Sequence, residues 1–231
     1  MLELFPSGFE EVDRQGSTEL VAYTDAGGEE RLWHAFGGVT ASDVDSGWED
    51  RWRDFHRPVR VGPLWIGPPW ERSPADALAV VVDPGRAFGT GAHATTRLCL
   101  ELLLEVPRGS VLDVGCGSGV LAIAAARLGF APVVAVDVEE AAVEATQLNA
   151  AANGVAVETR RLDALVDELP PADTVLANIA LETVRALGPR LRAQHVVTSG
   201  YLTRDAPDLA GYRRVGRRDG DGWAADLHER R

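Results

Sequence analysis

The stretch VLDVGCGSGV, residues 111–120, decides the fold. An apolar run that carries one acid, Asp113, breaks there into three alternating glycines. An apolar helical pattern follows over residues 120–128, and a second apolar run ends in Asp137. A strand, a glycine turn, a helix and a second strand that ends in a carboxylate predict a nucleoside-binding half-fold, because the carboxylate suits the two hydroxyls of a ribose.

The spacing of the glycines separates two kinds of nucleoside site. A dinucleotide fingerprint has glycines at its first, third and sixth positions, but the sixth position counted from Gly115 is Val120. Gly115, Gly117 and Gly119 form G-x-G-x-G instead. This pattern resembles the first motif of Rossmann-like methyltransferases that use S-adenosylmethionine, and the resemblance implies that the three glycines lie under this cofactor. A glycine-rich turn in another α/β protein is the alternative.

Length and composition limit the class of protein. The 231 residues are enough for one α/β domain and a small second one. No apolar run approaches the roughly 20 residues of a membrane span. The acidic N-terminus lacks the basic region of a signal peptide, and two cysteines, Cys99 and Cys116, are too few for a disulfide framework or a metal site. We therefore expect a cytoplasmic protein with no membrane partner and no bound metal.

The charge balance bears on the partner. The formal net charge is −12 at pH 7. Such a surface repels phosphate groups, which argues against direct binding of nucleic acid. It suits a basic protein as partner; acidity that serves only solubility is the alternative.

The order of the predicted elements indicates an α/β sheet. Short strands are expected at 20–23 and 31–36, ahead of a proline-rich, charged stretch at about residues 70–80. Strands and helices alternate after it, and the last two strands flank the turn at 219–222 as a hairpin. This order predicts a doubly wound, mostly parallel sheet with a C-terminal antiparallel hairpin, whose ligands lie beyond the carboxyl ends of the strands. The expected strands are 78–84, 111–114, 133–136, 155–159, 174–178, 195–199, 212–217 and 223–228, and the expected helices are 94–105, 120–128, 139–152 and 181–191.

The segment DPGRAFGTGAHATTR, residues 83–97, supplies further candidate ligand-binding residues. Its glycines favour a mobile loop that leads into a helix. Phe88 is a candidate to pack against the adenine or the methionine chain of a cofactor, and Thr95, Thr96 and the helix N-terminus can hydrogen-bond a carboxylate. His93 is a candidate for a hydrogen bond to the cofactor or the substrate, or for a structural role.

Asn178, in the stretch LANIA, ends the strand expected at 174–178. Transfer of a methyl group to an amine needs a neutral nitrogen lone pair, whereas a lysine amine, with a pKa of about 10.4, is protonated at neutral pH. Amide and carbonyl oxygens accept the remaining N–H bonds of the amine without adding positive charge. Asn178 is therefore the candidate catalytic residue for amine methylation; the alternative is that it only caps the next helix.

Several motifs together resemble the ribosomal protein L11 methyltransferase family (PrmA). They are PGRAFGTGAHATTR, LDVGCGSGVLAIAAARLG, VDVEEAAVEATQLNAAANGV, ANIALETV and SGYL, and the similarity extends from about residue 48 to 202. The resemblance implies a Rossmann-like seven-stranded core, S-adenosylmethionine as cofactor, and methylation of lysine and N-terminal amines of a large-subunit ribosomal protein. It also implies that Phe88 lies on a loop that closes over the cofactor. The positions that match cofactor contacts of the family are Thr96, Gly115, Asp137 and Asn178.

The remaining expectations concern one more site residue and the domains. Asp163, on the loop after the strand expected at 155–159, is a candidate for a contact with the adenine amino group. Members of the family begin with a small α/β domain that grips the ribosomal substrate, and this chain is expected to begin inside its first helix, at LELFPSGFEEV. We therefore expect a reduced α+β recognition domain at 1–47, a linker at 48–76 and a methyltransferase domain at 77–231.

Two other functions stay open at this point. One is methylation of a different amine, on a small molecule or on another protein. The other is a non-catalytic module that binds the cofactor and uses its core for protein interaction. The intact glycines, Asp137 and Asn178 argue against the second.

Overall fold

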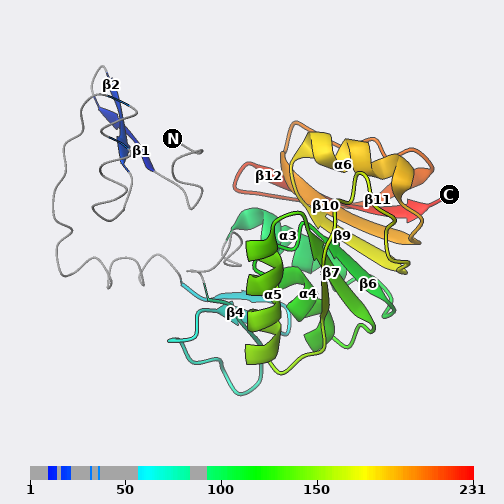
Figure 1. Cartoon of the computed structure of the whole chain (residues 1–231), viewed down its shortest axis with the longest axis horizontal. Coiled ribbons are helices and arrows are strands. Elements are labelled where there is room, and N and C mark those ends of the chain that lie inside the picture. The colour runs from blue at the N-terminus through cyan, green and yellow to red at the C-terminus, as the bar shows by residue number, and fades with distance from the viewer. Residues whose placement is uncertain (1–9, 15–16, 22–31, 33–35, 37–56, 84–92) are drawn as a thin grey trace. The chain divides into compact units, whose positions relative to one another are not determined.

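The computed structural model describes residues 10–14, 17–21, 32, 36, 57–83 and 93–231 (Figure 1). Contacts divide the chain into two units, residues 1–53 and 54–231. In the first unit, strand β1 (Glu10–Arg14) pairs antiparallel with β2 (Ser17–Val21). The expected division into domains after residues 47 and 76 stays a prediction.

Two expectations for the first unit are wrong. The helix expected over the stretch LELFPSGFEEV is contradicted at residues 10–12, which belong to β1 and pair with β2, because pairing with a neighbour outweighs local propensity. The strand expected at 31–36 is contradicted at Leu32 and Phe36, which are helical. These two lie four residues apart, as neighbours on one helix face do, and a short apolar run does not separate the two possibilities.

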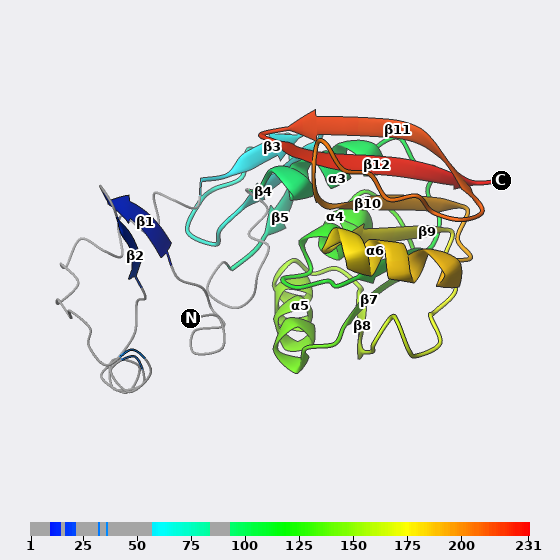
Figure 2. The same ribbon diagram turned by 90° about the horizontal axis from the view of Figure 1, so that it is seen from above.

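The second unit contains the predicted mostly parallel sheet. Its strand order is β11-β12-β10-β9-β6-β7-β8, in which the five strands from β10 to β8 are parallel and β11 and β12 form the antiparallel hairpin (Figure 2). The strand order reverses between β6 and β9, and such a switch point is where α/β sheets bind ligands. The strands are β6 (Val111–Val114), β7 (Val133–Asp137), β8 (Glu158–Arg161), β9 (Thr174–Asn178), β10 (His195–Leu202), β11 (Tyr212–Gly220) and β12 (Trp223–Arg230).

Helices cover both faces of this sheet. Alternate strand residues fall into two core clusters, since successive side chains of a strand point to opposite faces. One cluster joins Val111 and Leu176 to α3 (Ala94–Leu103), α4 (Val120–Arg127) and α5 (Glu140–Ala152). The other joins Leu112 and Val175 to α6 (Leu181–Leu187) and to Leu191, which directly follows the 3-10 helix Gly188–Arg190. In Figure 1, α4 and α5 lie on one side of the central strands and α6 on the other.

Most element bounds match the sequence-based expectations. The strands at 111–114 and 174–178 are confirmed residue for residue. The strand expected at 155–159 begins later, at Glu158. The helix expected over 181–191 ends at Leu187 and gives way to the 3-10 helix Gly188–Arg190, because Pro189 has no backbone N–H with which to continue the hydrogen bonds of the α-helix. In the part of the chain that the structure describes, no helix combines the length and the apolar character needed to cross a membrane.

The strand expected at 78–84 does not join the main sheet. It forms β5 (Leu78–Val81), which pairs in parallel with β4 (Leu64–Gly67), and β4 pairs antiparallel with β3 (Val59–Val61). The predicted linker therefore contains two whole strands, β3 and β4, and Leu64 and Ile66 of β4 are fully buried. The end of β5 is held by Asn153, the C-cap residue of α5, whose side chain pairs with both the N–H and the C=O of Val81.

Gly200 allows β10 to pass close to the end of β9. The register of β10 against β12 shifts between Ser199 and Tyr201, and Gly200 lies there with a φ of +99°. A Cβ atom on Gly200 would lie 2.2 Å from the carbonyl oxygen of Ile179. Ile179 follows Asn178 directly and donates its N–H to the oxygen of Ser199 at 3.2 Å. The glycine therefore permits the backbone path on which the position of Asn178 depends.

Substitution of Gly200 should test this close approach. Gly200→Ala should lower the free energy of unfolding by about 3 kcal/mol or more, because a strained φ and a backbone clash act together. Gly211 is the matched control: its φ is +83°, and no atom lies within 4 Å of a Cβ built on it. Gly211→Ala should cost only the left-handed strain, about 1–2 kcal/mol. If urea unfolding gives the same loss of unfolding free energy for both variants, the contact with Ile179 does not constrain the fold.

Candidate functional site

The glycine loop follows β6 at the switch point of the sheet. Gly115, Gly117 and Gly119 have φ values of +71°, +54° and +81°, a region in which side chains are unfavourable. The N–H groups of Gly115 and Cys116 both donate to the oxygen of Val136, at 2.9 and 3.1 Å. Gly119 then serves as the N-cap of α4. The loop is therefore tied to β7 at its start and to a helix at its end.

Packing supplies a second reason for two of the glycines. A Cβ on Gly115 would lie 2.4 Å from Cγ2 of Ile179, and a Cβ on Gly119 would lie 2.7 Å from Cγ2 of Thr146. Real Cβ atoms do not approach neighbours so closely. The sequence argument rested on room for a cofactor; the structure adds that these two positions have no room for a side chain within the protein itself.

The carboxylate of Asp137 stands at the end of β7 and is held by two backbone amides. Its Oδ2 accepts from the N–H of Gly117 at 3.1 Å, and its Oδ1 accepts from the N–H of Glu139 at 3.1 Å. Each carboxylate oxygen has a second lone pair. Asp137 is thus fixed beside the glycine loop, with acceptor capacity left for a pair of hydroxyl groups.

The candidate residues on α3 and β9 meet at the same edge of the sheet. Nδ2 of Asn178 lies 3.2 Å from Oγ1 of Thr95 and 3.5 Å from Oγ1 of Thr96. Both threonines are buried in the first turn of α3. The side chain of Asn178 does not cap the next helix, because the N-cap of α6 is Ala180 and no side chain bonds there. The capping alternative for Asn178 is therefore not supported.

His93 determines which way the amide of Asn178 points. Nδ1 of His93 accepts from the N–H of Thr95 at 3.4 Å, so this nitrogen carries a lone pair. Oγ1 of Thr95, 2.8 Å from the same nitrogen, must then donate its proton to it. The lone pairs that remain on Oγ1 accept from Nδ2 of Asn178. Oδ1 of Asn178 is accordingly directed away from α3.

The surroundings of His93 favour this neutral form. Burial lowers the pKa of His93, Arg97 adds to the effect, and Asp221 opposes it. The ring also packs edge-on against Trp223, with the ring centroids 5.0 Å apart. The structure therefore assigns His93 to capping α3 and to a chain of hydrogen bonds that reaches Asn178.

Two further residues, Asp163 and Phe88, are predicted to contact the cofactor. Asp163 follows β8, and the N–H of Leu162 beside it donates to the oxygen of Asp137 at 2.9 Å. Oδ1 of Asp163 accepts from the N–H of Leu165 at 2.9 Å, which closes an exposed turn. The fold thus brings Asp163 to the same edge as Asp137. Phe88 lies outside the described residues, and its role stays a prediction.

Sequence reasoning missed two groups of residues at this edge. Val138 and Val166 are apolar but 53% and 72% exposed, and they follow Asp137 and Asp163 closely in the chain. The signal for Val138 was an apolar residue just beyond a predicted strand end, whereas Val166, in the loop after Asp163, had no such signal. Thr146 and Asn149 of α5 hydrogen-bond the glycine loop. Their signal was a polar pair three residues apart on an otherwise apolar helix face.

Asp113 faces inward, toward α4, rather than toward the site edge. Its side chain is 1% exposed, and Oδ2 accepts from the N–H of Ala122 at 3.1 Å. Burial raises the pKa of Asp113 to about 7, the bond from Ala122 opposes the rise, and the charge of Asp137 adds to it. Asp113 therefore anchors the first turn of the helix that follows the glycine loop.

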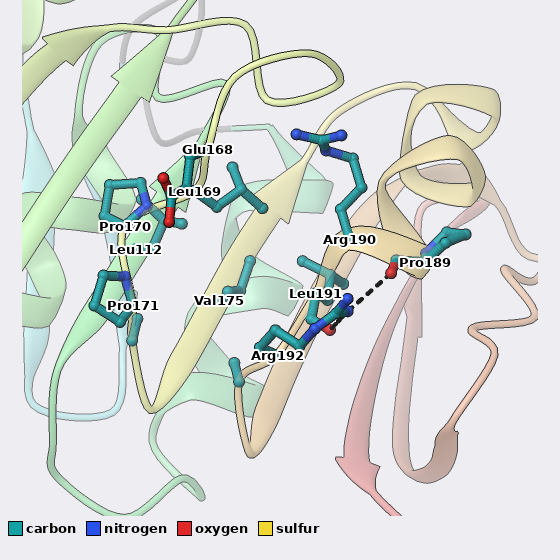
Figure 3. A pocket seen from close by; sticks show the side chains of 12 residues that line it. Leu112, Glu168, Leu169, Pro170, Pro171, Val175, Pro189, Arg190, Leu191 and Arg192 are labelled. Atoms are coloured by element: carbon teal, nitrogen blue, oxygen red, sulfur yellow. Dashed lines mark hydrogen bonds between the residues drawn. The ribbon is translucent and has the colours of Figure 1, made fainter.

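A separate cleft of about 570 Å³ opens on the face of the sheet that α6 covers (Figure 3). Leu112 and Val175 line its base, and Arg190 and Arg192 stand on the side formed by the chain before β10. None of the predicted site residues lines this cleft. Within the described ranges, no three His, Cys, Asp or Glu side chains gather as a metal ion would require.

The strand order, the glycine loop and the carboxylate at the end of β7 define the class: this is the Rossmann-like fold of methyltransferases. The family model "Ribosomal protein L11 methyltransferase (PrmA)" matches residues 13–205. Ribosomal protein L11 methyltransferases of Aliivibrio salmonicida and Legionella pneumophila (strain Lens) are 44% and 42% identical to the chain, over 73% and 72% of its length. The chain therefore belongs to the ribosomal protein L11 methyltransferase family.

A solved structure agrees with this assignment. The ribosomal protein L11 methylase from Lactobacillus delbrueckii subsp. bulgaricus superposes with a TM-score of 0.68 at 30% identity, covering 76% of this chain and 100% of that one. The chain spans 60% and 61% of the lengths of the Aliivibrio and Legionella relatives.

Replacement of Asp113 should change how stability depends on pH. Because the pKa of Asp113 is about 7 in the folded state, the unfolded state binds fewer protons than the folded state between about pH 4 and pH 7. The wild-type protein therefore loses stability through this group as the pH rises across that interval, and the loss is complete above it.

Asp113→Asn removes the titration and keeps an acceptor for the N–H of Ala122. We expect the stability of the variant relative to wild type to rise from about pH 4 to about pH 7 and then to level off, as measured by urea unfolding at several pH values. A difference between the two proteins that is independent of pH would contradict the burial of this carboxyl group.

Proposed function

We propose that this chain binds S-adenosylmethionine and transfers its methyl group to lysine and N-terminal amines of ribosomal protein L11, in the cytoplasm. The observation that carries the proposal is the fixed amide of Asn178, held by Thr95 and Thr96 at the switch point beside the glycine loop. The protein substrate is inferred from the relatives, which are ribosomal protein L11 methyltransferases. We also propose that the substrate protein L11 belongs to the large ribosomal subunit.

The residues at the sheet edge fit this cofactor. The glycine loop offers backbone without side chains at Gly115, Gly117 and Gly119, where the methionine and ribose would lie. The oriented carboxylate of Asp137 suits the two ribose hydroxyls. Val138 and the turn at Asp163 offer an apolar surface and a polar rim for the adenine ring. Thr96 and Phe88 complete the predicted cofactor contacts, together with Asn178.

The cofactor supplies an electrophilic methyl group on a positively charged sulfur. Asn178 would accept an N–H of the substrate amine through Oδ1, because Nδ2 is engaged by the threonines. That bond would aim the lone pair of the amine without adding a positive charge. A neighbouring positive charge also favours the neutral amine. We propose that the proton leaves to water and that positioning supplies most of the catalysis.

Charge supports a basic protein as partner. The net charge of −12 favours association with a basic ribosomal protein over direct contact with nucleic acid. Methylation of another amine, on a small molecule or a different protein, is the second candidate, since Asn178 would orient any primary amine. A module that binds the cofactor without catalysis is disfavoured by the hydrogen bonds that orient Asn178.

A labelling experiment tests the substrate. The chain is incubated with methyl-labelled S-adenosylmethionine and purified ribosomal proteins, and the products are analysed by mass spectrometry. We expect label on L11, at lysine side chains and at the N-terminal amine. Label only on a small metabolite would favour the second candidate. Absence of binding in calorimetry at millimolar cofactor would overturn both enzymatic proposals.

Two substitutions should separate chemistry from cofactor binding. Asn178→Ala should lower kcat on the order of 100-fold, because the lone pair of the amine is no longer oriented toward the methyl group. The Kd of the cofactor should rise less than about tenfold. Asp137→Ala should raise the Kd of the cofactor on the order of 100-fold, because two hydrogen bonds to a charged acceptor are lost. Steady-state kinetics and calorimetry measure both. An unchanged kcat in Asn178→Ala would leave this residue no catalytic role.

A further inference from the structure

One face of α5 is turned toward the glycine loop and carries buried polar side chains. Oγ1 of Thr146 donates to the oxygen of Gly117 at 3.0 Å. One turn further along the helix, Nδ2 of Asn149 donates to the oxygen of Ser118 at 2.9 Å. Thr146 and Asn149 are 0% and 4% exposed. Two consecutive carbonyl groups of the loop are therefore held from the same helix.

Asn149 differs from Thr146 because its amide also bonds outside the glycine loop, whereas both partners of Thr146, Cys116 and Gly117, lie within the loop. Its Oδ1 accepts from the N–H of Asp83, just beyond β5, at 3.4 Å. Both partners of the amide are backbone groups, an acceptor on Ser118 and a donor on Asp83, so its orientation is unambiguous. A single side chain thus links the glycine loop to the chain that leaves β5.

We infer that Asn149 is a positioning residue for the cofactor, and that it acts by holding the Ser118 carbonyl so that the glycine loop keeps its binding conformation. This inference rests on the proposed function of the loop. Asn149 is 4% exposed and both ends of its amide are engaged by backbone groups, so it acts through the loop rather than by touching the cofactor. None of the motifs in the chain assigns it this role.

The physical reason lies in the flexibility of the loop. Three glycines at positive φ give the loop many alternative conformations, so its shape depends on bonds from outside. Ser118 is 1% exposed, which leaves its carbonyl little access to water if Asn149 is removed. The loop would then turn to find another partner. That movement would also disturb the N–H of Gly117, which orients Asp137.

The chain provides a matched control in Asn153, one turn further along. Asn153 is also buried, at 5% exposure, and its side chain also holds the end of β5: Oδ1 accepts from the N–H of Val81 at 2.8 Å, and Nδ2 donates to its oxygen at 2.6 Å. Its Nδ2 also donates to the backbone oxygen of Asn149, at 2.8 Å. Asn153 therefore shares the structural task of Asn149 but makes no hydrogen bond to the glycine loop.

The experiment compares Asn149→Ala with Asn153→Ala in the full chain. For each, thermal unfolding gives Tm, and calorimetry with S-adenosylhomocysteine gives Kd at a temperature where circular dichroism shows the variant to be folded. Both variants should lower Tm. Asn149→Ala should raise Kd about tenfold, since a lost buried hydrogen bond is worth about one power of ten in affinity. Asn153→Ala should leave Kd within about twofold of wild type.

A second variant identifies which half of the amide matters. Asn149→Asp keeps an acceptor for the N–H of Asp83 but loses the donor to Ser118. We expect its Kd to rise at least as much as that of Asn149→Ala. A wild-type Kd in Asn149→Asp would mean that the Asp83 bond is the one that matters, and would overturn the inference.

The remaining outcomes also decide between the two proposals. If wild type binds S-adenosylhomocysteine and Asn149→Ala binds it equally well, the inference is wrong and the proposed function stands. Equal losses of affinity in Asn149→Ala and Asn153→Ala would reduce Asn149 to a structural residue. If wild type itself does not bind S-adenosylhomocysteine, the proposed function is wrong, and the inference about Asn149 is overturned with it.

Discussion

The site depends on one backbone constraint, the double hydrogen bond from Gly115 and Cys116 to the carbonyl oxygen of Val136. This bond turns the chain at the end of β6 and ties it to β7, and the turn is possible only with a left-handed glycine. It fixes the start of α4, and it brings the N–H of Gly117 to the carboxylate of Asp137. The sheet provides two parallel strand ends, and this turn makes them one ligand-binding surface.

A second contact closes the site across the switch point. Asn178 belongs to β9 and the threonines belong to α3, so their hydrogen bonds join elements that are more than 80 residues apart in sequence. The close approach of Gly200 to Ile179 fixes the end of β9, and His93 fixes the hydroxyl of Thr95. Because each of these neighbours is fixed in turn, the amide of Asn178 has a single orientation. Preorganisation of this kind is what a reaction governed by positioning requires.

The sequence predicts the parts of this arrangement that depend on local pattern. The glycine loop, Asp137 and Asn178 stand at strand ends, and the ends of parallel strands meet at one edge of a sheet. It does not predict the sheet that β5 joins, because the choice of a pairing partner depends on residues far away in the chain. The direction of the Asn178 amide likewise depends on the proton position at His93, and the role of Asn149 depends on a carbonyl group brought to it only by folding.

The distribution of charge along this edge of the sheet agrees with the roles proposed for its residues, namely nucleoside binding at Asp137 and Asp163 and orientation of the amine at Asn178. Carboxylates stand where hydroxyl and amino groups of a nucleoside would bind, at Asp137 and Asp163. Around Asn178, among the residues that the structure describes, the side chains in this chain of hydrogen bonds are two hydroxyls and a neutral imidazole. A carboxylate in place of Asn178 would favour the protonated amine and so raise its pKa, which opposes attack on the methyl group. An amide accepts the same N–H bond without that penalty, so the choice of Asn over Asp at this strand end is itself an argument for an amine substrate.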